Sequence, residues 1–475
     1  MNDNVQKIHD VSMRILQKTG VKFHHPDAIK LLIDSGIKVK DDIAYFTEDQ
    51  IMYWIRQAPT AFNVAAKDPK YNMCFGGDNT YNGPSGGATL IQDPGGSLRN
   101  ATIDDYIKML RLYEVNEKFY VNGGNPCQPE DILIDYNALI LFYLSNRISS
   151  KVIFSATGNY NQMKSVIDLA MAVHGVTKEE MIKSPKMFNI VNMNSPLQMD
   201  INMTETLFAF LDYRQPMGIT SAAMCGTTSP VTIASAIALT NAEVIAGLAV
   251  AQMYAPGAPV FYGSQSTNAN LRNLCIATGS PEGALCYKYG AEMAKFYKVP
   301  SRGGGALTDA KTVNAQAGYE SMLTYLACKS SGLNLILHSA GVMDSYMAMS
   351  FEKMIVDFEI IDYVDRYLSD ISVGNETVPE EVIDNVGPGG SFMMEPHTVK
   401  FCRYDQITPH ISVRGSFPNA TTKLEENIEA RIKALLESYK APDLSPDTIK
   451  NMSDLMTHYG VDAKYLQGLE EMLAR

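Results

Sequence analysis

The residues of this sequence that could do chemistry are mostly uncharged. Seven short apolar runs are typical of parallel strands, and amides and hydroxyls stand where these runs end. Only one acid, Asp309, and one imidazole, His338, occupy such positions. The polar residues at the predicted strand ends are Asn122, Asn125, Ser155, Thr157, Asn192, Asn194, Thr220, Ser221, Tyr262, Ser264, Gln265, Thr308, Asp309, His338 and Ser339. This set favours binding and orientation of a substrate over acid–base catalysis.

The same residues exclude several classes of enzyme. A glycosidase needs two facing carboxylates, which the predicted strand ends do not supply. The eight histidines show no ligand spacing, the seven cysteines form no C-x-x-C motif, and no phosphate-binding loop occurs. We therefore expect no metal ion and no cofactor bound to the chain itself.

Aromatic residues accompany the neutral polar groups. Tyr81, Tyr262, Tyr346 and Phe351 lie in or near the predicted loops above the strands, although any one of them can equally be ordinary core. A quaternary ammonium ion has no hydrogen to donate and is held by the faces of aromatic rings. A pocket of neutral polar groups and rings would suit such a cation.

The elements that must position these residues alternate regularly. Strand-like runs separated by helical segments predict right-handed βαβ units with a parallel sheet, and this number of strands predicts a closed (β/α)8 TIM-type barrel. The eighth strand is expected either at 389–395 or in the irregular region before residue 120. The predicted strands span 119–124, 151–157, 187–194, 215–224, 258–265, 300–309 and 334–341.

Three parts are predicted along the chain. Residues 1–117 form an N-terminal helical and glycine-rich extension, 118–415 the catalytic barrel, and 416–475 a C-terminal helical tail.

The chain has 475 residues and a net charge of −12, which disfavours nucleic acid and anionic membranes as partners. The apolar run 229–253 contains Glu243 and is expected to be a buried helix. The odd cysteine count and the hydrophilic start favour the cytoplasm.

Long segments of the chain are similar to a known family. The chain resembles the trimethylamine methyltransferase superfamily, in its non-pyrrolysine branch of quaternary-amine (betaine) methyltransferases. The resemblance implies a (β/α)8 barrel, a partner corrinoid protein that carries cob(I)alamin or methylcobalamin, and methyl transfer from an N-methylated amine to Co(I). It leaves open whether the chain forms a homo-oligomer. The similar segments are HDVSMRILQKTGVKFHHPDAIKLL, NMNSPLQMD (192–200), GTTSPVTIASAIALTNAEVIAGL (226–248), PGAPVFYGS (256–264), TDAK with AQAGYES (308–321) and HSAGVMDSYMAMSFEKMIVD (338–357).

The chain differs from the trimethylamine enzymes because it contains only standard residues and no pyrrolysine. A quaternary ammonium already has a neutral amine as its leaving group, so Co(I) can displace it without an acid at nitrogen. A tertiary amine would need activation first. The sequence therefore predicts quaternary substrates, and glycine betaine, proline betaine, carnitine and γ-butyrobetaine all remain open.

Given this resemblance, particular residues can be assigned to a betaine. We expect protonated His338 to bind the substrate carboxylate, Gln265 and Asn194 to make polar contacts, and Tyr81 and Tyr346 to form the cation cage. The glycine-rich loops at Gly86 and Gly304 are expected to meet the corrinoid protein, and Asp309 to cap the helix after its strand.

Two other functions are compatible with these residues. One is a cofactor-free barrel lyase or isomerase on a small polar acid, for which only Asp309 and His338 are placed to act as the base. The other is a betaine-binding protein without catalysis.

Overall fold

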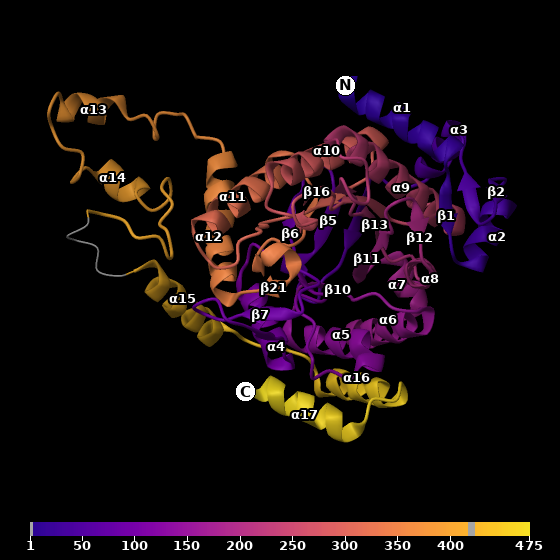
Figure 1. The fold of residues 1–475 in the computed structure, drawn as a ribbon. Coiled ribbons are helices and arrows are strands. Elements are labelled where there is room, and N and C mark those ends of the chain that lie inside the picture. Colours follow the sequence, from indigo (N-terminus) through magenta and orange to yellow (C-terminus); the bar gives the residue numbers. More distant parts are fainter. Residues whose placement is uncertain (1–2, 417–422) are drawn as a thin grey trace.

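The computed structural model describes residues 3–416 and 423–475, and its centre is a barrel of eight parallel strands (Figure 1). All seven predicted strands are present, so the predicted (β/α)8 barrel is confirmed. In order around the barrel the strands are β6 (Tyr81–Asn82), β9 (Val121–Gly123), β10 (Val152–Phe154), β11 (Met187–Met193), β13 (Met217–Ser221), β15 (Val260–Ser264), β18 (Ser301–Gly303) and β19 (Leu335–Ile336).

The eighth strand, β6, comes from the irregular region before residue 120. Tyr81 and Asn82 pair with Leu335 and Ile336 of β19, and Asn82 bridges to Phe119 just before β9, which closes the barrel. The alternative at 389–395 is wrong, because that segment lies outside the barrel and contains no strand. One barrel strand therefore lies within residues 1–117, the predicted N-terminal extension.

One main helix follows each barrel strand and covers the outside of the barrel. Six of these helices begin at a residue whose side chain caps them; for example, the Thr102 side chain accepts from the backbone N–H of Asp105, and the Asn159 side chain accepts from that of Gln162. The eight helices are α4 (Ile103–Val115), α5 (Asn137–Ile148), α6 (Tyr160–His174), α8 (Ile201–Leu211), α9 (Ile233–Tyr254), α10 (Pro281–Tyr297), α11 (Ala315–Ser330) and α12 (Phe351–Leu368). A short helix, α7 (Lys178–Lys183), precedes β11.

Helix α9 is the one helix, in the part of the chain that the structure describes, with the length and apolarity to cross a membrane. Eighteen of its 22 residues are buried, and it packs against α1, α3 and strand β13. Its apolar composition is therefore that of a core helix in this fold.

Aromatic and aliphatic side chains fill the barrel interior. Phe188 of β11 and Phe261 of β15 pack against Phe75, which belongs to a hairpin of β4 (Ala61–Val64) and β5 (Met73–Gly76). The hairpin lies at the amino ends of the strands, because Ala65 N–H donates to the carbonyl of Pro185 just before β11. The barrel is thus plugged at this end.

Smaller elements extend the barrel at both chain ends. The N-terminal elements pack on α9, and β12 (Gln198–Met199) joins their sheet; they are α1 (Asp3–Lys18), β1 (Val21–Phe23), α2 (Pro26–Asp34), β2 (Lys38–Lys40), β3 (Ile43–Tyr45) and α3 (Glu48–Ile55). The C-terminal helices are α15 (Leu424–Ser438), α16 (Pro446–His458) and α17 (Ala463–Ala474). Residues 417–422 of the predicted tail lie outside the described residues.

Two small sheets surround the carboxyl ends of the barrel strands. One contains β7 (Leu90–Gln92), β8 (Leu98–Asn100), β20 (Val342–Met343) and β21 (Ala348–Met349), and the other β14 (Met224–Cys225), β16 (Thr267–Asn270) and β17 (Cys275–Ala277). Three single-turn helices are η1 (Pro69–Tyr71), η2 (Ile134–Tyr136) and η3 (Asp344–Tyr346). Between α12 and α15 the chain makes a long excursion that carries α13 (Glu380–Val386) and α14 (Pro396–Phe401) (Figure 1).

Candidate active site

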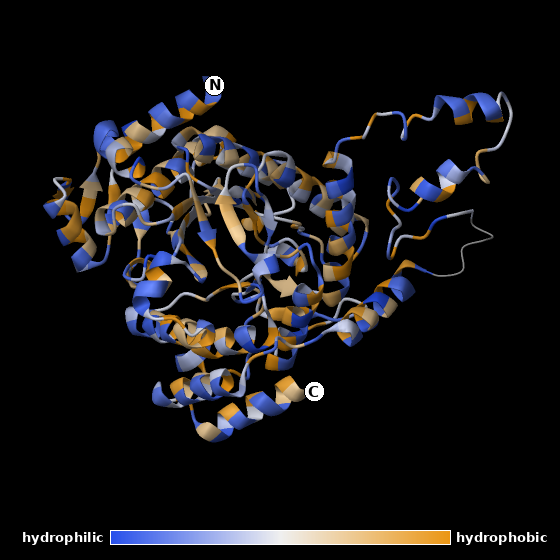
Figure 2. Ribbon diagram, turned by 180° about the vertical axis from the view of Figure 1, so that it is seen from behind, coloured by the Kyte–Doolittle hydropathy of each residue, from blue (hydrophilic) through white to orange (hydrophobic). Residues whose placement is uncertain are grey.

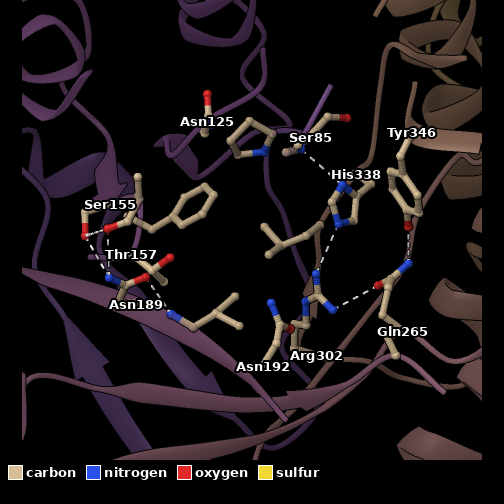
Figure 3. A pocket seen from close by; sticks show the side chains of 18 of the residues that line it. Ser85, Asn125, Ser155, Thr157, Asn189, Asn192, Gln265, Arg302, His338 and Tyr346 are labelled. Atoms are coloured by element: carbon tan, nitrogen blue, oxygen red, sulfur yellow. Dashed lines mark hydrogen bonds between the residues drawn. The ribbon is translucent and has the colours of Figure 1, made fainter. Parts of the chain in front are cut away.

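A cavity of 590 Å³ lies at the carboxyl ends of the barrel strands, where this fold places its reactive groups (Figure 3). Among the described residues that line the cavity, Arg302 is the one side chain with a permanent charge. The lining residues are Pro84, Ser85, Gly86, Gly87, Asn125, Asn137, Phe154, Ser155, Ala156, Thr157, Asn189, Ile190, Asn192, Ala222, Gln265, Arg302, Leu337, His338 and Tyr346.

Arg302 projects from β18 into the cavity and is only 6% exposed. One guanidinium nitrogen, Nη1, donates to Oε1 of Gln265 at 2.9 Å, and Nη2 lies 3.1 Å from Nε2 of His338. Its Nε has no hydrogen-bond partner, and in the described residues no carboxylate pairs with it. Burial holds the pKa of this guanidinium below its usual range. A buried cation without a counter-ion is costly, so this wall of the cavity is built to receive an anion.

The contacts of Gln265 fix the orientation of its amide. Because Oε1 accepts from Arg302, Nε2 faces the other way, where it donates to the hydroxyl of Tyr287 at 3.2 Å and to that of Tyr346. Gln265 therefore links the guanidinium to two tyrosines through hydrogen bonds whose direction is set.

The contacts of His338 indicate a neutral ring and not the protonated one expected from the sequence. The backbone N–H of Gly86 points at Nδ1 from 3.2 Å while Arg302 approaches Nε2, so both ring nitrogens face donors. A protonated imidazole has no acceptor for either donor, and a neutral ring has one. Burial, with the charge of Arg302 as the second cause, holds the pKa of His338 well below its usual range. The free site therefore leaves one donor beside His338 unsatisfied.

Tyr346 reaches the cavity from a strained turn. Asp344, Ser345 and Tyr346 have φ angles of 49°, 52° and 73°, a left-handed conformation that costs non-glycine residues about 1–3 kcal/mol each. The hydroxyl of Ser345 donates to Oδ1 of Asp309 at 2.7 Å, and Lys311 forms an ion pair with Asp344. These contacts hold the Tyr346 ring edge-on to His338, with 4.9 Å between the ring centroids.

Asp309 is not a helix cap, which corrects the sequence-based expectation. Asn314 caps α11, and its side chain accepts from the N–H of Ala317. The Asp309 carboxylate instead accepts from the N–H and hydroxyl of Thr278, at 2.7 and 3.0 Å, besides the bond from Ser345. It joins the turn that carries Tyr346 to the segment before α10.

The opposite wall of the cavity is neutral (Figure 3). Asn189 donates through Nδ2 to the hydroxyl of Ser155 at 2.8 Å, and Phe154 contributes its ring. The side-chain oxygen of Asn125 is buried without a hydrogen-bond partner. Carbonyl and hydroxyl oxygens together with a ring present partial negative charge, which suits a cation that cannot donate hydrogen bonds.

The structure brings three of the five predicted substrate-binding residues together. Gln265, His338 and Tyr346 line the cavity. Asn194, just beyond the end of β11, is exposed and does not line the cavity, whereas Asn189 and Asn192 of β11 do. Tyr81 lies at the plugged end of the barrel, where its hydroxyl accepts from the N–H of Cys74 at 3.0 Å, so the structure gives it no place in a cage.

Arg302 is the residue that sequence reasoning missed. The predicted strand ran to 309, which placed Arg302 near its beginning, whereas β18 ends at Gly303. Three glycines, Gly303 to Gly305, follow Arg302 in the sequence. They could have indicated that the strand ends there and that Arg302 lies at its carboxyl end.

The glycine-rich segment 83–87, GPSGG, matches the G-x-S-x-G pattern of serine hydrolases, although its serine is not an activated nucleophile. Ser85 donates its hydroxyl to the carbonyl of Ala340 at 2.8 Å, and His338 bonds the neighbouring Gly86 instead. In the described parts of the chain, no three His, Cys, Asp or Glu side chains gather to hold a metal ion.

Fold and site together define a (β/α)8-barrel enzyme whose pocket holds one buried cation opposite a neutral wall. A family model described as trimethylamine methyltransferase (MTTB) matches residues 1–459. The chain therefore belongs to the trimethylamine methyltransferase family, and it is a methyltransferase.

Individual relatives agree with this assignment. The chain is 36% identical to a glycine betaine methyltransferase of Desulfitobacterium hafniense over 448 residues, which cover 94% of this chain and 93% of the relative. It is 27% identical to a trimethylamine methyltransferase, MttB, of the same species over 94% and 91% of the two chains. The monomethylamine methyltransferase of Methanosarcina barkeri shares the fold, with a TM-score of 0.51, 11% identity, and 92% and 98% of the chains covered.

Proposed function

We propose that this enzyme transfers a methyl group from a betaine to Co(I) of a cognate corrinoid protein. Glycine betaine is the first candidate, because a relative named for it is 36% identical over nearly the whole chain. The seven cysteines are all free thiols, which supports a reducing, cytoplasmic location.

Arg302 is the observation that carries this proposal. A betaine has a carboxylate and a quaternary ammonium, and the cavity has a buried cation on one wall and neutral oxygens with a ring on the other (Figure 3). The carboxylate would pair with Arg302 and replace its neutral contacts to Gln265 and His338. His338 is then free to accept from Gly86 through Nδ1 and to donate its Nε2–H to the carboxylate, which satisfies both ring nitrogens.

The proposed transfer needs no acid or base from the chain. The corrinoid of the partner protein would supply Co(I) as the methyl acceptor, and the electron pair of the broken carbon–nitrogen bond would stay on nitrogen, so that the leaving group is a neutral tertiary amine. The chain's residues would hold the substrate in line with the opening of the cavity at the carboxyl ends of the strands and would exclude water. Their contribution to catalysis is therefore orientation of the substrate and exclusion of solvent.

The lyase or isomerase alternative lacks a base. Asp309 already accepts hydrogen bonds from Thr278 and Ser345, and it does not line the cavity. The pKa of His338 is held well below its usual range, so this ring is a poor proton acceptor.

The corrinoid protein would meet the chain at the open side of the cavity. Gly87 is exposed there and Gly86 is half-buried. Gly304 is buried, and an added Cβ would lie 2.6 Å from Cζ of Tyr287 and 2.8 Å from Nε2 of Gln265. A side chain at Gly304 would therefore disturb residues inside the pocket and would not reach a docking surface.

Gly304→Ala is expected to weaken betaine binding as well as methyl transfer, because the new methyl group collides with Tyr287 and Gln265 and forces Gln265, which lines the cavity, to shift. Gly318→Ala, where nothing lies within 4 Å of the added Cβ, is the matched control. Calorimetric titration of both variants with glycine betaine tests this. If Gly304→Ala binds glycine betaine with wild-type affinity, the result would instead support the docking role that the sequence predicted for this glycine.

Betaine affinity is expected to stay constant between pH 8 and pH 6. His338 is expected to stay neutral over this range, because the N–H of Gly86 donates to Nδ1 and burial beside Arg302 holds the pKa of the ring well below its usual range. If a protonated His338 bound the carboxylate, affinity would rise as the pH falls through its pKa, by up to about tenfold per pH unit. Titration calorimetry at three pH values, with free ligand of unchanged charge, distinguishes the two states.

The proposed function is tested by a spectral assay with free cob(I)alamin. We expect methylcobalamin to form with glycine betaine or with proline betaine, carnitine or γ-butyrobetaine, and not with trimethylamine, which lacks a neutral leaving group unless it is activated. Binding of a betaine without methylation, either of free cob(I)alamin or of the reduced corrinoid protein, would indicate a binding protein. Turnover of trimethylamine at a rate similar to that of a betaine would overturn the mechanism.

A further inference from the structure

The loops of the small sheet of β14, β16 and β17 carry three exposed apolar side chains. Val231, Leu271 and Leu274 are 58%, 58% and 64% exposed, and we call these three residues the rim patch. Leu271 and Val231 lie side by side, because a Cβ added to Gly226 would be 2.6 Å from Cδ2 of Leu271 and 3.6 Å from Cγ2 of Val231. The excursion with α13 and α14 extends away from the barrel (Figure 2), whereas the rim patch lies at the carboxyl ends of the barrel strands.

The two loops that carry the rim patch begin in the wall of the cavity. Ala222 and Gln265 line the cavity directly after the barrel strands β13 and β15, which are neighbours. The chain then runs outward through β14 and β16, which pair in parallel. A body that covers the rim patch therefore also lies beside the opening of the cavity.

The turn between β16 and β17 holds its two leucines in a fixed position. The N–H of Leu274 donates to the carbonyl of Asn270 at 2.7 Å, and the N–H of Cys275 donates to Oδ1 of Asn273 at 3.1 Å. Leu274 has a φ angle of 60°, a left-handed conformation that is unusual for a bulky residue. Backbone strain of this kind persists at functional positions, and here it holds an apolar side chain out in water. The turn is therefore built to present these leucines to a partner.

The surface around the rim patch is almost uncharged. Although the chain has a net charge of −12, its segments 222–232 and 265–280 contain one charged residue, Arg272. The centres of protein interfaces are likewise depleted of charged residues. Asn270 and Asn273 are exposed beside the leucines. A corrinoid is a flat ring whose edge carries neutral amide side chains, so a surface of leucines and asparagines is complementary to it.

The apolar surface extends beyond the rim patch. Ile233 follows Val231 by two residues and lines a groove of 440 Å³ between α1, α9 and α10, together with Leu285. The patch and the groove together offer a partner a larger contact area than three side chains alone.

We propose that the rim patch is a docking surface for the corrinoid protein. This inference rests on the proposed function, in which Co(I) must come within bonding distance of a methyl group inside the cavity. A partner that brings its cofactor to the opening has to lie over the loops at the carboxyl ends of the strands. The rim patch is the apolar, uncharged and rigid part of the loops that follow β13 and β15, so it is where such a partner gains contact energy.

The test is calorimetric titration with the cognate corrinoid protein reconstituted with hydroxocobalamin. Leu271→Asp with Leu274→Asp should weaken its binding about a hundredfold or more, because docking would bury two unpaired charges. Aspartate tolerates the left-handed conformation of residue 274, so the turn should persist. Leu271→Ala with Leu274→Asn removes the apolar contact without adding charge, and its loss should be smaller.

Two further measurements separate docking from chemistry. Neither leucine lines the cavity, so the aspartate variant should bind glycine betaine and methylate free cob(I)alamin as the wild type does. Transfer to the protein-bound cofactor alone should fall. Ile33→Asp with Tyr53→Asp, at positions of α2 and α3 that are 56% and 59% exposed, is the matched control and should match the wild type in all three measurements.

Three outcomes would overturn the proposal. The first is wild-type affinity of the aspartate variant for the corrinoid protein. The second is the same affinity with a changed mass in gel filtration, which would assign the rim patch to contacts between copies of this chain. The third is an equal loss of transfer to free cob(I)alamin and to the corrinoid protein. Failure of the proposed function looks different, because the wild type itself would then methylate neither acceptor, and binding of the corrinoid protein is measured without methyl transfer.

Discussion

Arg302→Gln is expected to lower the affinity for glycine betaine by more than a hundredfold. The substitution removes the one permanent charge that lines the cavity in the described chain, and truncating one partner of a buried charge pair costs about 2–5 kcal/mol. Tetramethylammonium has no carboxylate, so its binding should change little or improve. Calorimetric titration with both ligands measures the difference.

Two controls separate recognition from damage to the fold. Arg56→Gln removes an exposed arginine far from the cavity and should bind both ligands as the wild type does. Because Arg302 is an uncompensated buried charge, its loss should leave the melting temperature unchanged or raise it. Equal losses for glycine betaine and tetramethylammonium would show that Arg302 does not bind the carboxylate.

Lys353→Met is expected to destabilise the protein by about 3–5 kcal/mol. Lys353 and Asp357 of α12 form an ion pair at 2.5 Å with both side chains fully buried, and Asp357 also accepts from the N–H of Gly341 at 2.8 Å. The substitution leaves Asp357 as an unpaired buried charge beneath the loop that follows His338. Urea unfolding followed by circular dichroism measures the loss.

The pH dependence and a double variant sharpen this test. Burial raises the pKa of Asp357 to about 6 even beside Lys353, above its unfolded value of 3.8. The penalty in Lys353→Met should therefore grow as the pH rises above 3.8 through the folded pKa, and should shrink in acid as the carboxyl group takes up its proton. Lys353→Met with Asp357→Leu should regain most of the stability. A double variant as unstable as the single one would mean that unpaired charge is not the cause.

Periodicity predicted most of the barrel, and its failures have local causes. Seven strands are apolar runs between turn residues, which are visible in one sequence. Strand β6 has two residues among glycines, asparagines and prolines, so no period exists to detect. Tyr81 was misassigned for the same reason, because the direction and end of such a short strand depend on its pairing with β19.

The candidate site was predicted in part. Gln265, His338 and Tyr346 follow or flank strand ends in the sequence, and the structure places all three in the cavity. The protonation state of His338 could not be predicted from the sequence, because it depends on Arg302. Arg302 comes 36 residues earlier and lies beside the ring only because β18 and β19 are neighbours in the barrel. A residue's protonation is set by neighbours in space, which spacing along the chain does not give.

The hairpin of β4 and β5 has a kinetic consequence. It plugs the amino end of the barrel, so the described residues leave the cavity open at the carboxyl ends of the strands. In the proposed reaction the substrate, the demethylated amine and the corrinoid must all use that opening. The betaine then has to enter before the corrinoid protein docks, and the amine has to leave after the corrinoid protein departs. Steady-state kinetics should show a compulsory order, in which excess corrinoid protein inhibits by occupying the empty enzyme and closing the path to the cavity.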